Sequence, residues 1–253
     1  MDVGLKDAVV LVTGSSSGIG RAAAIAFAQE GARVAITYHS DRAGAEATAQ
    51  QVEAAGGAAL ITPFDLADAA SIKAAIATIK DKWNALHVLI NNAAPANIAP
   101  TRGRLFEDVA PEQWQPVVRG VLEGAYLTVQ AALPLMRASG WGRIVNLSSD
   151  GAIHGVPGLA PYSSAKAGLS GLTLTLSAEL GAAHILTNSV MPGFVATESN
   201  LQIPQNYRDM IMSGTPSGHF TTPDDVARLI VFLGSQANGN VNGQTILISG
   251  GAR

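Results

Sequence analysis

The chain contains no cysteine among its 253 residues, so disulfide bonds and thiolate metal ligands are excluded. Its five histidines are scattered, with no HExxH or other paired spacing, and we therefore expect no metal site. No apolar run approaches the roughly 20 residues of a membrane span. The apolar run near the N-terminus is too short for a signal peptide. These absences predict a cytoplasmic protein with no membrane partner.

Charge is scarce as well. Only 14% of the residues are charged, against about 25% in an average globular protein. The net charge is −3, and no run of Lys or Arg offers a binding face for nucleic acid. We therefore expect no nucleic-acid partner. A chain that is 47% hydrophobic predicts extensive buried surface, part of which would be subunit contacts.

What the chain does contain is a regular alternation of short β-branched runs and Ala-rich helical stretches. This alternation predicts an α/β fold with a doubly wound parallel sheet and right-handed crossovers. Most of the expected strands are apolar on both faces, which is typical of parallel strands covered by helices on either side. The expected strands are 8–13, 33–38, 58–65, 88–92, 143–148, 185–191 and 245–249. The expected helices lie near 18–30, 42–55, 69–82, 111–137, 162–180 and 223–234.

The sequence has no linker or compositional break, which predicts a single domain over residues 1–253. Two long stretches rich in Pro, Gly, Ser and Thr, 93–110 and 192–222, follow the carboxyl ends of expected strands. Ligands of open α/β sheets bind at that edge. Long loops in compact domains are more often functional than idle. We expect residues of about 193–221 to form a substrate lid.

The first expected strand runs directly into TGSSSGIG (13–20), which precedes a helix. Gly14 permits a tight turn, Gly18 lets backbone N–H groups approach a pyrophosphate, and Gly20 allows close helix–sheet packing. The alternative is a glycine-rich turn without a ligand, but the position between a strand and a helix favours a dinucleotide. The expected contacts in this loop are Gly14, Ser16, Ser17, Gly18, Ile19 and Gly20.

The end of the second expected strand bears on the choice of dinucleotide. An NAD site usually places a carboxylate there, about 20 residues past the glycines. This chain has Tyr38 at that position, followed by His39, Ser40 and Arg42, which could hold a 2′-phosphate. The alternative for Arg42 is a solvated residue at a helix start. The pattern favours NADP(H) and leaves NAD(H) possible.

At the end of the third expected strand, Asp65 and Leu66 are placed to meet the adenine edge of the dinucleotide. Asp65 could equally cap the turn that follows.

The segment LSSDGAIHGVPGLAPYSSAK (147–166) follows the fifth expected strand. Tyr162 and Lys166 are four residues apart at a helix start, so they share a face, and they lie 13 residues or more past Ser149. Asp150 and His154 would either tune this site or lie in solvent, and we favour solvent.

Six segments together resemble the short-chain dehydrogenase/reductase family across essentially the whole chain, in its single-domain 3-oxoacyl-acyl-carrier-protein reductase form. They are TGSSSGIG, NNAA (91–94), Ser149, YSSAK (162–166), PGFVAT (192–197) and NGQTILISGG (242–251). The resemblance implies a three-layer Rossmann fold with strand order 3-2-1-4-5-6-7. It also implies a homotetramer, with a homodimer as the alternative.

The resemblance further implies hydride transfer between a nicotinamide and a small-molecule carbonyl or alcohol. Tyr162 would be the acid/base, and a nearby Lys166 ammonium would lower the pKa of its phenol from about 10 toward neutrality. Lys166 would also bond the nicotinamide ribose, Ser149 would donate to the carbonyl oxygen, and Ser148 would only satisfy backbone groups. The remaining residues expected at the cofactor are Asn91, Ala93, Pro192, Gly193, Val195 and Thr197. Those expected at the substrate are Ala94, Pro95 and Phe194, with Met210 or Met212.

Two positions depart from the family pattern. Ala94 replaces a glycine, and Val121, within VVRGVLEG (117–124), stands where the family has a catalytic Asn. In the family that Asn maintains a helix irregularity whose free carbonyl orders a water in a proton relay to the lysine. Gly120 would allow the same irregularity without an amide; the alternative is an ordinary helix that packs closely at Gly120 and Gly124.

The sequence thus favours an NADPH-dependent carbonyl reductase. A weakly active or non-catalytic cofactor-binding protein, acting as a sensor or structural partner, is the alternative that Val121 raises. A sugar or secondary alcohol dehydrogenase is the alternative among enzymes.

Overall fold

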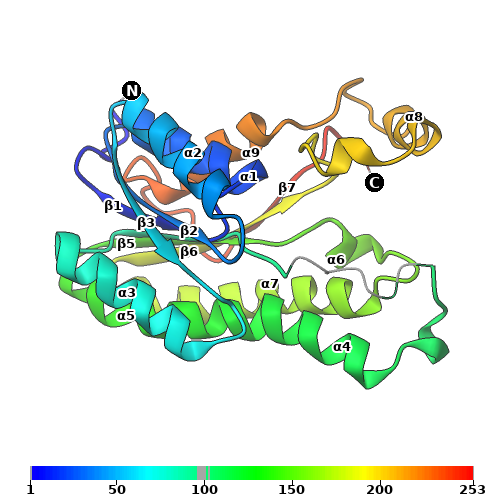
Figure 1. Cartoon of the computed structure of the whole chain (residues 1–253), viewed down its shortest axis with the longest axis horizontal. Coiled ribbons are helices and arrows are strands. Elements are labelled where there is room, and N and C mark those ends of the chain that lie inside the picture. Colours follow the sequence, from blue (N-terminus) through cyan, green and yellow to red (C-terminus); the bar gives the residue numbers. More distant parts are fainter. Residues whose placement is uncertain (1, 96–100, 102, 253) are drawn as a thin grey trace.

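A computed structural model describes residues 2–95, 101 and 103–252 of the chain. A parallel sheet of seven strands in the order β3-β2-β1-β4-β5-β6-β7 forms the centre of the molecule (Figure 1). The predicted fold class, parallel orientation and strand order are confirmed. The strands are β1 (Val9–Val12), β2 (Arg33–Tyr38), β3 (Ala58–Pro63), β4 (Val88–Asn91), β5 (Gly142–Leu147), β6 (Ile185–Pro192) and β7 (Thr245–Ile248).

Burial explains why these apolar segments form a parallel sheet. Every residue of β1, β4, β5 and β6 is buried, so these strands are covered on both faces. Only the two edge strands, β3 and β7, have exposed residues at some of their positions.

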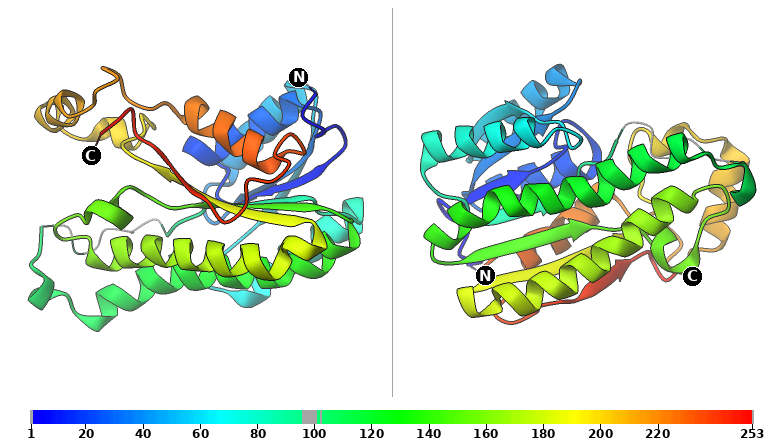
Figure 2. Two further views of the ribbon diagram at one scale, coloured as in Figure 1. Left: turned by 180° about the vertical axis from the view of Figure 1, so that it is seen from behind. Right: turned by 90° about the horizontal axis from the view of Figure 1, so that it is seen from below.

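Helices cover the sheet in two layers, as the apolar strands require (Figures 1 and 2). One layer contains α1 (Gly18–Gln29), α2 (Arg42–Ala54) and α9 (Pro223–Gly234). The other contains α3 (Ala69–Trp83), α4 (Pro111–Val118), α5 (Gly124–Ala138) and α7 (Ala160–Leu180). Two apolar core clusters match the two layers: one includes Phe27 and Ile230, and the other includes Ile79, Met136 and Leu176. Among the described residues, no helix is long and apolar enough to cross a membrane.

Local sequence fixes where several helices begin. The Asp41 carboxylate accepts a hydrogen bond from the Gly44 N–H group (2.9 Å) at the start of α2. Thr222 and Asp225 exchange hydrogen bonds in a capping box that begins α9.

The expected helix over 111–137 is interrupted by a π-helical turn, η2 (Arg119–Glu123), between α4 and α5. Short helices also occur where sequence periodicity is too weak to predict them. These are η1 (Phe106–Asp108), α6 (Gly151–His154), η3 (Gly181–Ala183), η4 (Asn200–Gln202) and α8 (Gln205–Ser213).

Candidate active site

The carboxyl ends of β1, β4, β5 and β6 bring chemically distinctive segments to one edge of the sheet. Gly14, Asn92, Ser149 and Gly193 each follow one of these neighbouring parallel strands within two residues. Two cavities, of about 500 and 480 Å³, are lined by residues from this edge. We refer to them as the glycine-loop cavity and the tyrosine cavity.

The glycine-loop cavity brings together many of the residues predicted to hold a dinucleotide. Its walls include Gly14, Ser16, Ser17, His39, Ser40, Asp65, Leu66 and Ala93, together with Ala94 and Pro95, which were expected at the substrate. Ile19, Gly20 and Asn91 are not among its wall residues. Gly18 is next to Thr197, whose methyl group would lie 3.4 Å from a Cβ added to Gly18.

The glycine loop combines a left-handed glycine with a helix N-terminus that has no side-chain cap. Gly14 has φ +65°, and a Cβ added to it would lie 2.9 Å from the Cα of Ala93. Ser17, the residue before α1, makes no side-chain bond to the helix, so its first-turn N–H groups have no side-chain cap. The carbamoyl oxygen of buried Asn91 has no hydrogen-bond partner within the described part of the chain. These features fit a dinucleotide pyrophosphate and ribose.

Both of the arrangements expected for Asp65 are present. Its carboxylate caps the following turn, accepting from the Ala67 N–H group at 2.8 Å, and it also lines the glycine-loop cavity. Its other oxygen lies 3.6 Å from His39 Nε2.

Arg42 does not line the glycine-loop cavity. Its Nε lies 2.9 Å from Glu46 Oε1, one turn further along α2, and the side chain is 72% exposed. The alternative of a solvated residue at a helix start therefore describes Arg42. The polar side chains that line this end of the cavity include those of Tyr38, His39, Ser40 and Asp41.

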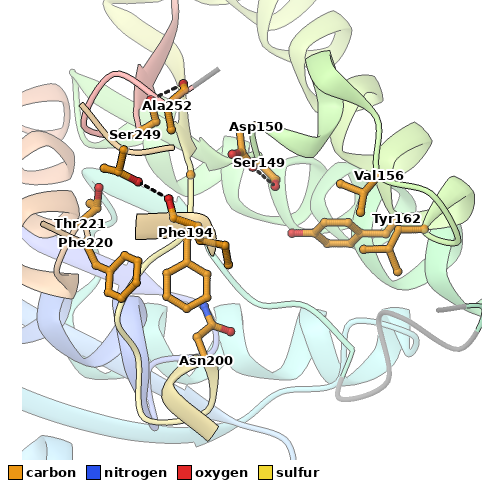
Figure 3. A pocket seen from close by; sticks show the side chains of 14 residues that line it. Ser149, Asp150, Val156, Tyr162, Phe194, Asn200, Phe220, Thr221, Ser249 and Ala252 are labelled. Atoms are coloured by element: carbon orange, nitrogen blue, oxygen red, sulfur yellow. Dashed lines mark hydrogen bonds between the residues drawn. The ribbon is translucent and has the colours of Figure 1, made fainter. Parts of the chain in front are cut away.

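The tyrosine cavity contains the reactive residues of the fifth strand end (Figure 3). The phenol of Tyr162 points into the space between Ser149 and the aromatic residues Phe194 and Phe220 (Figure 3). The two phenylalanine rings pack with their centroids 4.8 Å apart. The other residues that line the cavity are Asp150, Val156, Leu159, Gly193, Asn200, Ile211, Thr215, Thr221, Ser249 and Ala252.

The electrostatics of Tyr162 differ from expectation. Burial of its phenol raises the pKa of Tyr162, a hydrogen bond with Ser149 lowers it, and the nearby Asp150 carboxylate raises it further. The net shift is upward, so the predicted lowering by Lys166 is wrong for this structure. The reason is that desolvation of the phenolate outweighs its favourable contacts.

Lys166 lies beneath the tyrosine, one helical turn along α7. Its Nζ donates to the Leu147 carbonyl oxygen at 2.5 Å and lies 5.8 Å from the centroid of the Tyr162 ring. Burial lowers the pKa of Lys166 to about 8. Ser148 donates to the Lys166 carbonyl oxygen at 2.9 Å, so it satisfies a backbone group as predicted.

Ser149 and Asp150 are hydrogen-bonded to one another. Ser149 Oγ donates to Asp150 Oδ1 at 3.2 Å and accepts from the Gly151 N–H group at 3.2 Å. The expectation that Asp150 lies in solvent is wrong, because the β5–α6 turn directs it into the tyrosine cavity. His154 is exposed and does not line the cavity, as expected.

The helix irregularity of the family pattern is present without an asparagine. In η2 the Gly124 N–H group donates to the carbonyl oxygen five residues earlier, that of Arg119. A Cβ added to Gly120 would overlap the ring of Pro95. Val121 is 3% exposed and packs in an apolar cluster that includes Tyr162. The irregularity is therefore present with a valine at position 121, and the missing Cβ of Gly120 makes room for Pro95.

Some residues of both cavities were not predicted. Asn92 braces the glycine loop by donating to the carbonyl oxygens of Thr13 (2.9 Å) and Gly14 (3.1 Å), and its place directly after a strand was an available signal. Ile211 lines the tyrosine cavity instead of the expected Met210 or Met212, and Met210 is 62% exposed. Pro192, Val195 and Thr197 line neither cavity. The long stretch expected at 93–110 lies partly outside the described residues.

Comparisons with known proteins identify the family. The chain matches a family model described as Enoyl-(Acyl carrier protein) reductase over residues 14–253. It is 35% identical to the 3-oxoacyl-(acyl-carrier-protein) reductase of Thermotoga maritima, with 98% of each chain covered. It is 36% identical to the protein of that name from Synechocystis, with 96% of each covered.

Solved structures agree with this assignment. A putative short-chain alcohol dehydrogenase from Sinorhizobium meliloti superposes with a TM-score of 0.91 at 30% identity, with 99% of this chain and 98% of that chain covered. A 7α-hydroxysteroid dehydrogenase complexed with NADH and 7-oxo glycochenodeoxycholic acid gives 0.92 at 25% identity, with 99% and 96% covered. The chain is therefore a member of the short-chain dehydrogenase/reductase family of oxidoreductases.

Proposed function

We propose that this protein is an NAD(P)H-dependent ketoreductase of the 3-oxoacyl-acyl-carrier-protein reductase type, with Tyr162 as its proton donor. The observation that carries the proposal is the joint placement of Ser149, Tyr162 and Lys166 where β5 ends and α7 begins. Ser149 and Tyr162 share one cavity. Lys166 is buried directly beneath them, with its ammonium held by the Leu147 carbonyl group.

The phenol of Tyr162 is the proton source in this proposal. Burial raises its pKa above the ordinary value, so the phenol carries its proton at neutral pH. Ser149 would hold that oxygen through its hydroxyl hydrogen and stabilise the negative charge that develops on it. The nicotinamide dinucleotide, when bound, supplies the hydride. Lys166 would bond its ribose and keep positive charge next to the phenol.

The glycine-loop cavity supports the choice of cofactor. We assign to the cofactor Gly14, Ser16, Ser17, Gly18, Ile19, Gly20, Asp65, Leu66, Asn91 and Ala93, with Pro192, Gly193, Val195 and Thr197 toward the nicotinamide. NADP(H) is favoured, because His39 and Ser40 line the cavity and Tyr38 replaces the carboxylate of an NAD site. Ala94, Pro95 and Phe194 are assigned to the substrate.

We further propose that residues 1–253 act as one dinucleotide-binding and catalytic domain and that residues of about 193–221 cover the substrate. Phe194, Ile211 and Phe220, from both ends and the middle of that segment, all line the tyrosine cavity, which supports the lid. A homotetramer remains our expectation for assembly.

Turnover tests the proposal directly. Oxidation of NADPH and of NADH is measured with a panel of ketones and 3-oxoacyl thioesters, for the wild type and for Tyr162→Phe. We expect turnover that favours NADPH, and a loss of about 100-fold or more in kcat for the variant with cofactor affinity retained. Tight NADPH binding without turnover above the variant would support a sensor or structural protein instead.

A further inference from the structure

The tyrosine cavity contains one carboxylate, and no cationic side chain accompanies it. Asp150 is the only Asp or Glu among the described residues that line the cavity, and no Lys, Arg or His lines it. Within the described part of the chain, the carboxylate takes part in no ion pair. Its one side-chain hydrogen bond is the one that it accepts from Ser149 Oγ at 3.2 Å.

This hydrogen bond competes with the proposed reaction. A serine hydroxyl has a single hydrogen to donate. Ser149 gives it to Asp150, and the Gly151 N–H group occupies an acceptor position of the same oxygen. The hydrogen bond by which Ser149 would stabilise a Tyr162 phenolate draws on the same hydrogen. When Ser149 instead donates to a substrate carbonyl oxygen, Asp150 loses its donor. The half-buried carboxylate then faces the cavity without a protein donor, and a suitable substrate would supply the replacement.

Geometry limits where on the substrate that donor lies. A carbonyl oxygen bonded to Ser149 would sit within about 6 Å of the Asp150 carboxylate, given ordinary hydrogen-bond lengths. A donor on the carbon next to the carbonyl spans this interval.

A hydroxyl group suits the surroundings better than an ammonium group. An ammonium has three hydrogens to place, and the cavity offers a single carboxylate. The other polar groups that line the cavity are an asparagine and hydroxyls, including those of Thr215, Thr221 and Ser249. The apolar remainder, with the packed rings of Phe194 and Phe220, would hold a hydrocarbon or aromatic substituent.

We propose that Asp150 is a specificity-determining residue that selects α-hydroxy ketones, by accepting a hydrogen bond from the hydroxyl next to the reacting carbonyl. The inference rests on the proposed ketoreductase chemistry, and it places the preferred substrate outside the 3-oxoacyl thioesters, which carry no hydroxyl on that carbon. Reduction adds a hydride from the nicotinamide to the carbonyl carbon and a proton from Tyr162 to its oxygen. The products are a vicinal diol and the oxidised dinucleotide, and the selecting hydroxyl is unchanged. The same carboxylate disfavours ketones that carry an anion at that position.

Three ketones that differ at one group test the proposal. Propiophenone, α-hydroxyacetophenone and benzoylacetate are all phenyl ketones. On the carbon next to the carbonyl they carry a methyl, a hydroxyl and a carboxylate group, respectively. With wild type, kcat/KM is expected to be highest for the hydroxy ketone and lowest for benzoylacetate. In Asp150→Val the ratio of hydroxy ketone to propiophenone is expected to fall about tenfold, and in Asp150→Asn benzoylacetate is expected to gain relative to propiophenone.

The ratios of kcat/KM between ketones distinguish substrate selection by Asp150 from an effect of Asp150 on the position of Ser149. If Asp150 only positioned Ser149, all three ketones would lose activity in proportion and the ratios would stay constant, which would overturn the inference. Asp224→Asn removes an exposed carboxylate at the start of α9 and serves as the charge-matched control, with unchanged ratios expected.

Ligand-observed NMR gives the same comparison without turnover. Saturation transfer to α-hydroxyacetophenone should exceed that to propiophenone with the wild type, and the excess should disappear with Asp150→Val. Equal transfer in the wild type would contradict the role of Asp150. If the wild type binds α-hydroxyacetophenone in preference to propiophenone but oxidises no NADPH with any ketone, the ketoreductase function is contradicted. The role of Asp150 in selecting the ligand is then still supported.

Discussion

Lys166 is a buried cation that the fold holds with a single carbonyl group. Its neighbours include the Tyr162 ring and the Leu147 carbonyl oxygen, and burial lowers its pKa to about 8. A group of this kind lowers stability where it is protonated, because the unfolded chain solvates the charge better. Its place next to Tyr162 is consistent with a cost to stability that the proposed reaction would require.

The pH dependence of stability follows from this shift. The pKa of Lys166 is about 8 in the folded state and has its ordinary value of 10.5 in the unfolded state. The unfolded state therefore binds more protons between these two pH values. Stability therefore rises with pH across that window. The free energy of unfolding of the wild type, relative to that of Lys166→Met, should rise by roughly 3 kcal/mol between pH 7 and pH 10.5.

Urea unfolding of both proteins at a series of pH values measures the difference. The Met variant lacks the titrating amine, so other groups cancel in the comparison. A difference that stays constant across this range would mean that Lys166 has an ordinary pKa in the folded protein.

At the scale of single residues, the sequence predicted that Ser149, Tyr162 and Lys166 lie near one another, because their spacing and place after a strand are distinctive. It was less informative for Asp150 and Arg42. Asp150 turns into a cavity because of the short helix that follows it, and Arg42 turns away because Glu46 lies one helical turn further on. Neither orientation is encoded in the identity of the residue alone.

Among the elements, η2 carries the main departure from the family pattern. The π-helical turn forms although Val121 occupies the position of the family's asparagine. The absent Cβ of Gly120 makes room for the Pro95 ring, and Val121 fills an apolar cluster. In this chain the π-helical turn is accompanied by the packing of Val121 and by the close approach of the Gly120 backbone to Pro95, and not by an asparagine side chain.

Gly120→Ala should disturb both the turn and the glycine-loop cavity, which Gly120 and Pro95 line. The new Cβ overlaps the Pro95 ring, so we expect a loss of about 1–3 kcal/mol in stability and a higher KM for NADPH. Gly171→Ala, at a position in α7 where a Cβ would meet no atom within 4 Å, is the matched control and should be neutral or stabilising. Thermal unfolding and steady-state kinetics give both quantities. Wild-type values for Gly120→Ala would show that the close approach to Pro95 is unimportant.

Val121→Asn would bury an amide in the apolar cluster of Val117, Ala125, Ala165 and Leu169. We expect it to cost about 1–3 kcal/mol and to leave kcat unchanged or lower, since the irregularity already exists. A higher kcat would indicate instead that the natural protein has a weakened proton relay.

The regular elements were the easiest to predict, because strands buried on both faces and long amphipathic helices have strong periodic patterns. The π-helical turn and α8 were not predicted as elements. Gly120 indicated where the π-helical turn would lie. Whether a helix tightens or widens at a glycine, however, depends on the residues that pack against it. The nine residues of α8 are too few for the helical spacing of Tyr207, Met210 and Ile211 to separate them from a loop, and none of them is buried.

For the molecule as a whole, the order of the sheet was predictable from the family resemblance and from the right-handed crossover rule. The position of the site at the carboxyl edge followed from that topology. The shape of the tyrosine cavity was not predictable. Its walls combine the β5–α6 turn with Phe194 and Phe220 at opposite ends of a long irregular segment, and only tertiary packing brings these together.

The central claim for the whole molecule is hydride transfer from a nicotinamide to a carbonyl carbon, with the proton supplied by Tyr162. The most direct measurement uses NADPH that carries deuterium on the transferable position of the nicotinamide, with a reducible ketone from the panel. Mass spectrometry and NMR of the alcohol should find one deuterium on the carbinol carbon with the wild type, and at least about 100-fold slower formation of that product with Tyr162→Phe. An alcohol without the label, or a Tyr162→Phe variant that forms labelled alcohol at the wild-type rate, would contradict the account.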